Sequence, residues 1–151
     1  MTTINETKIT KAHGQQRASI IALLQTEKLP AEDLPVSLDN FLVATEDDKV
    51  IGAIGLEQYD NYGLLRSMVV DKEYRNKNIA SQLVQQLENY TATIGITCLY
   101  LLTETAAQYF ERKGYSKISR DEVPVSLQAS SEFSSVCPVS AIVMKKPMAS
   151  I

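Results

Sequence analysis

Met68-Val69-Val70-Asp71-Lys72-Glu73-Tyr74-Arg75-Asn76-Lys77-Asn78-Ile79-Ala80-Ser81 is the stretch that decides the fold of this chain. An apolar run of strand character ends at Val70, a short charged turn follows, and an amphipathic helix opens at about Ile79. The segment therefore predicts a strand, a loop with exposed backbone amides and a helix N-terminus. Unpaired amides at a helix start, together with the positive end of the helix dipole, bind phosphate or pyrophosphate. We expect a ligand with a phosphate group.

The elements that flank this loop predict a strand, a helix and a second strand over residues 64–102. The helix has one apolar stripe, and Gly95 is expected to end it. Residues 64–70 form a nearly continuous apolar run interrupted by one arginine, and residues 96–102 are expected to form a second, buried strand. A crossover helix of this length makes its flanking strands parallel, and ligands bind beyond the carboxyl ends of such strands. The phosphate loop lies at that end.

Hydrophobic periodicity predicts further elements on both sides of this segment. Before it we expect a strand at 4–9, a helix from 14 or 15 to 29, and a hairpin of strands 41–45 and 50–56. After it we expect a helix at 105–113, a strand at 115–118, a surface loop with one helical turn, and a strand at 140–146. Gly52 and Gly55 in the hairpin predict a bulge or the close approach of another backbone or a ligand.

Composition predicts one globular domain over residues 1–151. The chain is 44% hydrophobic, with 15 basic and 18 acidic side chains and a net charge of -3. Because it contains no basic block, we expect neither nucleic acid nor an anionic membrane as a partner. Its longest apolar runs are too short for a membrane span and its N-terminus is polar, so a cytoplasmic location is expected.

The cysteines and the histidine predict neither disulfides nor a metal site. Cys98 and Cys137 are expected to be reduced thiols. His13 is the only histidine, so no Cys/His cluster for zinc can form, and its place beside Gly14 is typical of a helix start.

Two motifs and the order of elements resemble the GCN5-related N-acetyltransferase (GNAT) superfamily over about residues 4–147. The stretch Arg75-Asn76-Lys77-Asn78-Ile79-Ala80 is similar to the acetyl-CoA loop of that family, which has Arg or Gln, two residues, Gly, one residue, and Gly or Ala. Asn78 stands where glycine is usual. Asparagine tolerates the left-handed conformation that such a position requires.

The second motif runs from Thr103 to Tyr115 and departs from the family pattern at two positions. Thr103 stands where asparagine is common. Phe110 stands where many members carry a tyrosine that protonates the departing CoA thiolate. Because phenylalanine has no proton to give, the acid must be Tyr109, another group, water or nothing.

The resemblance implies an α/β fold with a central mixed, mostly antiparallel sheet of six to seven strands and about four flanking helices. The strands near 64–70 and 96–102 would form its parallel, splayed pair. Residues 63–67, 99–106 and 133–141 are more narrowly similar to a GNAT branch often found with arsenic-resistance genes. That branch is less well defined chemically.

The resemblance also implies the residues that hold acetyl-CoA as co-substrate. Backbone N–H groups of 76–81 would cradle the pyrophosphate, Arg75 would add a charge-assisted contact, and main-chain groups of 68–70 would bind the pantetheine arm and the thioester. Thr103 either binds pantetheine or caps the following helix. The donor-binding residues are therefore Met68, Val69, Val70, Arg75, Asn76, Lys77, Asn78, Ile79, Ala80, Ser81 and Thr103.

The implied reaction is direct transfer of an acetyl group to a small amine or amino-acid-like acceptor. An amine is protonated at neutral pH, so a base or a water chain must remove one proton before attack. Glu57, just past the strand at 50–56, and Glu104, at the end of the strand at 96–102, are the candidate bases. Each is alternatively a solvated surface carboxylate. Tyr109 is the candidate acid and alternatively a core residue.

Arg66, Ser135 and Cys137 are the candidate acceptor-binding residues. An unpaired guanidinium inside an apolar strand is costly, so Arg66 must reach an acidic group on the acceptor or form a structural ion pair with Glu57 or Glu104. On an alternating strand it would share a face with Met68. Cys137 begins the last strand, which lines the acceptor pocket in this superfamily, and packing is its alternative role.

Two rival functions stay open at this point. One is a GNAT-fold module that binds acyl-CoA with little catalysis, for which Phe110 and Asn78 are the indications. The other is a protein or peptide N-acetyltransferase, which requires an open acceptor groove. The sequence does not name the acceptor or decide whether arsenic is involved. GNAT domains commonly pair, so a homodimer is among the expected assemblies.

Overall fold

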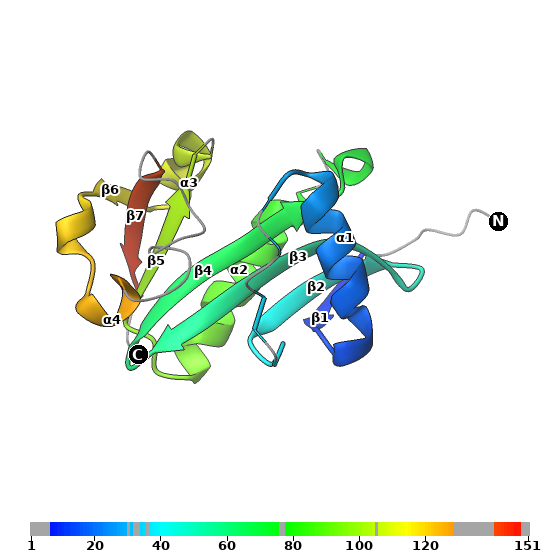
Figure 1. The fold of residues 1–151 in the computed structure, drawn as a ribbon, viewed down its shortest axis with the longest axis horizontal. Helices are drawn as coiled ribbons and strands as arrows, with labels where there is room; N and C mark the ends of the chain where they lie inside the picture. Colours follow the sequence, from blue (N-terminus) through cyan, green and yellow to red (C-terminus); the bar gives the residue numbers. More distant parts are fainter. Residues whose placement is uncertain are drawn as a thin grey trace. The chain divides into compact units, whose positions relative to one another are not determined.

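The computed structural model describes residues 7–29, 31, 34–35, 37–75, 78–104, 106–128 and 141–148. Within them, seven strands form one mixed sheet in the order β1-β2-β3-β4-β5-β7-β6 (Figure 1). The strands are β1 (Lys8–Lys11), β2 (Phe41–Glu46), β3 (Lys49–Tyr59), β4 (Tyr62–Val70), β5 (Cys98–Thr103), β6 (Ser116–Ile118) and β7 (Ile142–Pro147). The helices are α1 (Arg17–Thr26), α2 (Ile79–Thr93), α3 (Ala107–Arg112) and α4 (Val125–Gln128), with 3-10 helices η1 (Gly14–Gln16), η2 (Lys72–Tyr74) and η3 (Arg120–Glu122). The expected α/β fold, with one parallel strand pair and about four helices, is confirmed.

Contacts divide the chain into two compact units, and strands β3 and β4 run through both. The first unit comprises Met1–Leu56 and Ser67–Asn89, and the second comprises Glu57–Arg66 and Tyr90–Ile151. The single domain expected over the whole chain stays a prediction.

The hairpin of β2 and β3 in the first unit closes on two residues. Glu46 pairs with Lys49, and the two residues between them, Asp47 and Asp48, have φ values of 52° and 64°. Two successive left-handed residues define a type I′ turn, whose twist matches that of the flanking strands. The predicted hairpin is confirmed, but its second strand continues to Tyr59. The prediction ended the strand at Leu56 because the apolar run ends there. Strand pairing is made by backbone groups and does not require apolar side chains, so the strand continues.

Helices α1 and α2 cover opposite faces of the strands in the first unit (Figure 1). On one face, buried side chains of α1 pack in a core with Phe41 and Ala53. On the other face, a Cβ added at Gly52 would meet Leu83 Cδ1 of α2 at 3.2 Å and the Val69 carbonyl oxygen at 3.1 Å. Successive β3 residues thus alternate between the helices.

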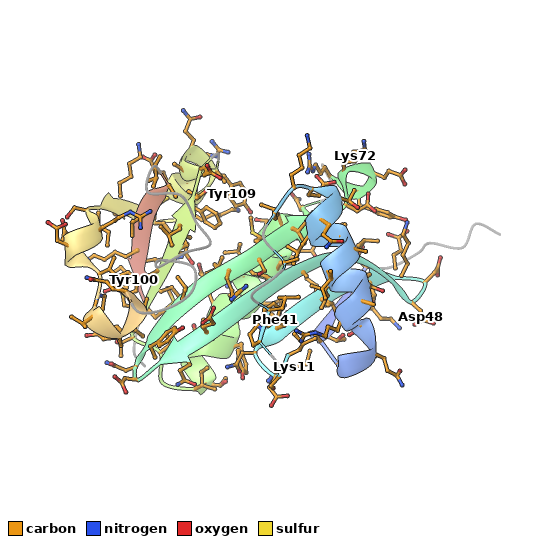
Figure 2. All side chains as sticks on the ribbon, in the orientation of Figure 1. Lys11, Phe41, Asp48, Lys72, Tyr100 and Tyr109 are labelled. Atoms are coloured by element: carbon orange, nitrogen blue, oxygen red, sulfur yellow. The ribbon has the colours of Figure 1, made fainter. Side chains whose placement is uncertain are left out.

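Gly55 provides space for the Phe41 ring. A Cβ added at Gly55 would lie 2.4 Å from Phe41 Cζ, and the Phe41 side chain is fully buried (Figure 2). The predicted close approach of another backbone is confirmed at Gly52, where the neighbour is the Val69 carbonyl oxygen, whereas at Gly55 the neighbour is a side-chain ring, which was not predicted.

Helix α1 ends three residues earlier than its apolar pattern predicts. Lys28 has φ = 61°, the Lys28 N–H bonds to the Gln25 carbonyl, and the Leu29 N–H bonds to the Leu24 carbonyl. These two bonds form a Schellman motif, which reverses the chain before Pro30 could stop the helix. The predicted end at Leu29 is wrong for this reason.

The second unit contains the parallel pair. Strands β4 and β5 pair from Tyr62↔Cys98 to Leu64↔Tyr100, and β7 runs antiparallel to both β5 and β6. The core of the second unit contains one buried side chain from each of β4, β5 and β7, and two from the segment that contains α4. These residues are Leu64, Tyr100, Val143, Val123 and Leu127.

Helix α3 ends at a left-handed glycine, as predicted. Gly114 has φ = 96°, and the Tyr115 N–H bonds to the Phe110 carbonyl. The Lys146 ammonium of β7 donates to the Lys113 carbonyl at 2.9 Å and lies 5.5 Å from the centre of the Tyr115 ring. A cation thus binds at the negative end of the helix.

The remaining element boundaries differ from the predictions by a few residues. The first described strand continues beyond Ile9 to Lys11, while residues 4–6 lie outside the described part. Strand β5 begins two residues later than expected, since the Thr97 N–H bonds to the Asn61 carbonyl in the β3–β4 turn. The single helical turn expected after 118 is present as α4.

Candidate functional site

A left-handed residue interrupts strand β4 beside the donor loop. Ser67 has φ = 55°, although the residues on both sides belong to the strand. A residue in this conformation reverses the regular alternation of side chains, as in a β-bulge. Arg66 and Met68 flank this residue, and the expectation that they share a face by simple alternation stays a prediction. The break lies directly before the main-chain groups of 68–70 that are expected to contact the thioester.

The turn after β4 in the first unit is fixed by its own hydrogen bonds. The Asp71 N–H bonds to the Ile51 carbonyl at 2.8 Å, and Asp71 Oδ1 accepts from the Glu73 N–H at 3.0 Å. The Tyr74 N–H closes η2 on the Asp71 carbonyl at 2.8 Å. Figure 2 shows Lys72 on this 3-10 helix. The amides of Glu73 and Tyr74 are thus occupied within the turn, so neither is available to a phosphate.

Asn78 starts helix α2 in the left-handed conformation that its residue type suggested. Its φ is 61°, and its carbonyl accepts the first helical hydrogen bond, from the Gln82 N–H at 3.0 Å. Among the described residues, no acceptor is recorded for the N–H groups of Ile79 and Ala80. These amides have the direction and partial charge that suit an anion at a helix N-terminus. Asn76 and Lys77 lie outside the described residues.

Substitution of Asn78 tests the conformation of this loop. Asn78→Gly is expected to leave the free energy of unfolding nearly unchanged and to keep the Kd of CoA within about twofold, because glycine adopts φ > 0 freely. Asn78→Val is expected to cost about 1–2 kcal/mol of unfolding free energy and to weaken CoA, because a β-branched residue disfavours this conformation. Thermal unfolding and calorimetric titration with CoA measure both effects. Equal behaviour of the two variants would contradict the assigned backbone role.

Glu57, Tyr59 and Arg66 form a hydrogen-bonded group in the second unit. Arg66 Nη1 donates to Glu57 Oε2 at 2.5 Å, and the Tyr59 hydroxyl donates to Glu57 Oε1. The Arg66 side chain is 1% exposed and that of Glu57 is 18% exposed. The ion pair with Glu57, one of the alternatives for Arg66, is therefore present. Glu57 itself lies inside β3, not past its end as predicted.

The residues at the end of β5 and in α3 differ in their surroundings. Thr103 Oγ1 accepts from the Ala106 N–H at 2.9 Å, so its side chain stabilises the turn into α3. Glu104 is exposed, and its carboxylate pairs with no cation among the described residues. Tyr109, which is labelled in Figure 2, contacts the Phe110 ring edge-on, and the Lys113 ammonium lies 5.5 Å from the centre of the Tyr109 ring. Phe110 itself is buried and packs against Tyr115, so it is a core residue.

Sequence reasoning missed two side chains that contact the candidate residues. Tyr59 follows Glu57 by two positions, and on a strand this spacing places both on one face, which was the available signal. Glu27, at the end of α1, forms an ion pair with Arg75. No local pattern indicates that contact, because its partners are distant in sequence.

Burial excludes Tyr100 as a base. Its ring packs edge-on against Tyr62, and burial, with a contribution from the Cys98 side chain, raises the pKa of its hydroxyl above the ordinary value. The hydroxyl therefore stays protonated at neutral pH.

Two of the candidate acceptor-binding residues cannot be placed. Ser135 and Cys137 lie outside the described residues. In the described ranges, no three His, Cys, Asp or Glu side chains gather into a group suited to a metal ion. In the same ranges, none of the helices is both long enough and apolar enough to cross a membrane.

The described strands form a mixed sheet with one parallel pair, β4 contains a left-handed residue, and another left-handed residue directly precedes α2. A family model described as acetyltransferase (GNAT) domain matches residues 37–117. The chain therefore belongs to the GNAT acetyltransferase family. This match contains β4, the donor loop and β5.

Curated relatives match about two thirds of this chain. An amino-acid acetyltransferase of Aeromonas salmonicida is 26% identical over 99 residues, which are 64% of this chain and 22% of that protein. An uncharacterized N-acetyltransferase of Chlorobaculum tepidum is 30% identical over 98 residues, 64% of this chain and 63% of that protein. The chain thus spans less than a quarter of the amino-acid acetyltransferase that it matches.

Solved structures share the fold at low sequence identity. The N-acetylglutamate synthase of Neisseria gonorrhoeae, complexed with coenzyme A and N-acetyl-glutamate, has a TM-score of 0.82 at 17% identity, over 97% of this chain and 36% of that chain. A GNAT-family acetyltransferase of Staphylococcus aureus has a TM-score of 0.76 at 23% identity, over 95% of this chain and 100% of that chain. These likenesses establish the fold.

Proposed function

We propose that this protein is an acetyl-CoA-dependent N-acetyltransferase that acts on a small amine or amino-acid-like acceptor. The observation that carries the proposal is the start of α2, where Asn78 is left-handed and the N–H groups of Ile79 and Ala80 are available to an anion. The family match to this segment supports acetyl-CoA as the donor. The match to amino-acid acetyltransferases supports an amino-acid-like acceptor.

The donor loop would bind acetyl-CoA through its pyrophosphate. Amides at the start of α2 donate to phosphate oxygens, and Arg75, whose side chain is 55% exposed, adds a charge-assisted hydrogen bond. The main chain of 68–70, directly after the break at Ser67, offers hydrogen bonds to the pantetheine arm and to the oxyanion of the tetrahedral intermediate. The bound acetyl group is then fixed before the acceptor attacks.

Transfer proceeds by attack of a neutral amine nitrogen on the thioester carbonyl carbon. A C–N bond forms, the C–S bond breaks, and the CoA thiolate leaves with a proton from Tyr109 or water. We assign removal of the acceptor proton to Glu104, directly or through water, because its carboxylate has no cation partner in the described part of the chain. Glu57 has hydrogen bonds on both oxygens, which favours a positioning role.

This division of roles between the two carboxylates is tested by matched amide variants. Glu104→Gln is expected to lower kcat about 100-fold with little change in Tm, because a general base contributes about 10²-fold or more. Glu57→Gln is expected to change Tm more than Glu104→Gln does, because it removes the charge that pairs with Arg66. Steady-state kinetics and thermal unfolding measure the two effects. An unchanged kcat in Glu104→Gln would remove this residue from the mechanism.

The activity itself is tested by combining titration with turnover. Calorimetric titration with acetyl-CoA is expected to show one site, and thiol release over a panel of amines and amino acids is expected to identify the acceptor. Tight binding without turnover on any amine would favour an acyl-CoA-binding module. Turnover only on peptides would favour a protein N-acetyltransferase. An arsenic-containing amino acid in the panel tests the relationship to the arsenic-resistance branch.

We also propose that the protein is cytoplasmic and needs no metal ion, with a homodimer among its expected assemblies. Sedimentation with and without CoA measures the assembly.

A further inference from the structure

An ion pair in the first unit connects the donor loop to helix α1. Arg75 Nη2 donates to Glu27 Oε1, and the side chains are 55% and 13% exposed respectively. Arg75 belongs to the loop, whereas Glu27 directly follows the last residue of α1. The Glu27 side chain is thus mostly buried, and about half of the Arg75 side-chain surface is open to solvent.

The position of Glu27 is unfavourable for a carboxylate when only the helix is considered. It is the C-cap of α1, where the negative end of the helix dipole repels an anion. The next residue, Lys28, occupies the left-handed position that glycine usually takes. Nothing in the helix itself favours a carboxylate here. The favourable interaction comes from Arg75, a residue distant in sequence.

Arg75 has capacity for a second anion while it is bound to Glu27. A guanidinium carries five N–H donors. Among the described residues, the bond to Glu27 is the one recorded for this side chain. The Arg75 side chain as a whole is 55% exposed, so a ligand can reach it from solvent. One guanidinium can therefore bridge a fixed carboxylate and a phosphate oxygen.

We propose that Glu27 is a positioning residue for acetyl-CoA: it holds the Arg75 guanidinium in the orientation that receives the pyrophosphate. This inference rests on the proposed function. In the free protein an arginine without a partner would sample many rotamers, and ordering it would reduce the affinity for the donor. Glu27 orders the side chain before the ligand arrives. It touches Arg75 and acts through it.

Glu27→Gln tests the proposal with two acetyl donors. The Kd of CoA is expected to rise about three- to tenfold, and the KM of acetyl-CoA to rise in parallel with kcat unchanged, because only the binding of the donor depends on Arg75. Acetyl-pantetheine has no pyrophosphate, so its KM is expected to stay the same. A general loss of structure would affect both donors, and only a positioning role affects one.

Two further variants serve as controls. Glu73→Gln removes the same charge from an exposed position in the same loop and is expected to leave CoA affinity unchanged. Arg75→Met is expected to weaken CoA by itself, and Glu27→Gln is expected to have no further effect in that background. Circular dichroism and Tm confirm that each variant is folded.

Three results would overturn the inference. They are an unchanged or lower Kd of CoA in Glu27→Gln, an equal loss with acetyl-pantetheine, and additive effects of Glu27→Gln and Arg75→Met. If the wild-type protein does not bind CoA, the proposed function fails together with this inference. If the wild type binds and Glu27→Gln binds equally well, only the inference fails.

Discussion

Arg66→Met is expected to lower the free energy of unfolding by about 3 kcal/mol, the low end of the range for breaking a buried ion pair. The Arg66 side chain is 1% exposed and is the cation recorded beside the Glu57 carboxylate. Methionine preserves most of the volume but leaves the carboxylate with the Tyr59 hydroxyl and limited solvent. Urea unfolding at neutral pH, with the slope of the transition compared between variants, measures the loss.

A double variant separates the unpaired charge from the loss of packing. Arg66→Met combined with Glu57→Gln is expected to recover part of the lost stability, because the remaining group is then neutral. A double variant less stable than Arg66→Met alone would show that the charge left on Glu57 is not the source of the effect. If Arg66 also receives an acidic group of the acceptor, the folded variant would lose acceptor affinity and keep CoA affinity. Equal loss of both would identify a structural arginine.

Gly55→Ala is the second substitution with a large expected effect. It is expected to destabilise the protein by about 1–3 kcal/mol, as overpacking of a close-packed core does. The added Cβ would lie 2.4 Å from Phe41 Cζ, and because the ring is fully buried in the α1 core it has little freedom to move away. Differential scanning calorimetry should show a fall in Tm of about 2–4 °C per kcal/mol for a chain of this size.

Two companion variants show whether the Phe41 ring causes the effect of Gly55→Ala. Phe41→Leu in the Gly55→Ala background is expected to cost less than the two single substitutions added together, because the shorter side chain leaves room for the new methyl group. Gly14→Ala is the matched control, since a Cβ there has no neighbour within 4 Å. If Gly55→Ala and Gly14→Ala shift Tm equally, the contact with Phe41 is not responsible.

The donor loop illustrates what residue type and pattern can predict. Asparagine is one of the few residues that adopt φ > 0 with little strain, so the conformation of Asn78 followed from its identity. The parallel pairing of β4 and β5 followed from a crossover helix between two apolar strands. Glycines ended α2 and α3 as expected, with φ values of 78° at Gly95 and 96° at Gly114. In each case the information is local.

The errors arose at backbone conformations that residue type does not encode and at contacts between residues distant in sequence. Ser67 adopts φ = 55° inside a strand although serine has no marked preference for this conformation, so no sequence pattern indicated the break. Lys28 ends α1 in the left-handed region through two backbone bonds that its side chain does not predict. The partner of Arg75 was missed because Glu27 lies on another element. Arg66 was predicted to need a partner, and only the structure distinguished Glu57 from Glu104.

The β2–β3 hairpin and the parallel β4–β5 pair differ in the length of chain that must close before each of them forms. The type I′ turn at Asp47–Asp48 joins strands that are neighbours in sequence. The pairs Tyr62↔Cys98 and Leu64↔Tyr100 form only after the whole of α2 has been enclosed as a loop, which has a larger entropic cost. In a refolding experiment, amide protection is therefore expected to appear first in the β2–β3 hairpin and later in β5 and β7.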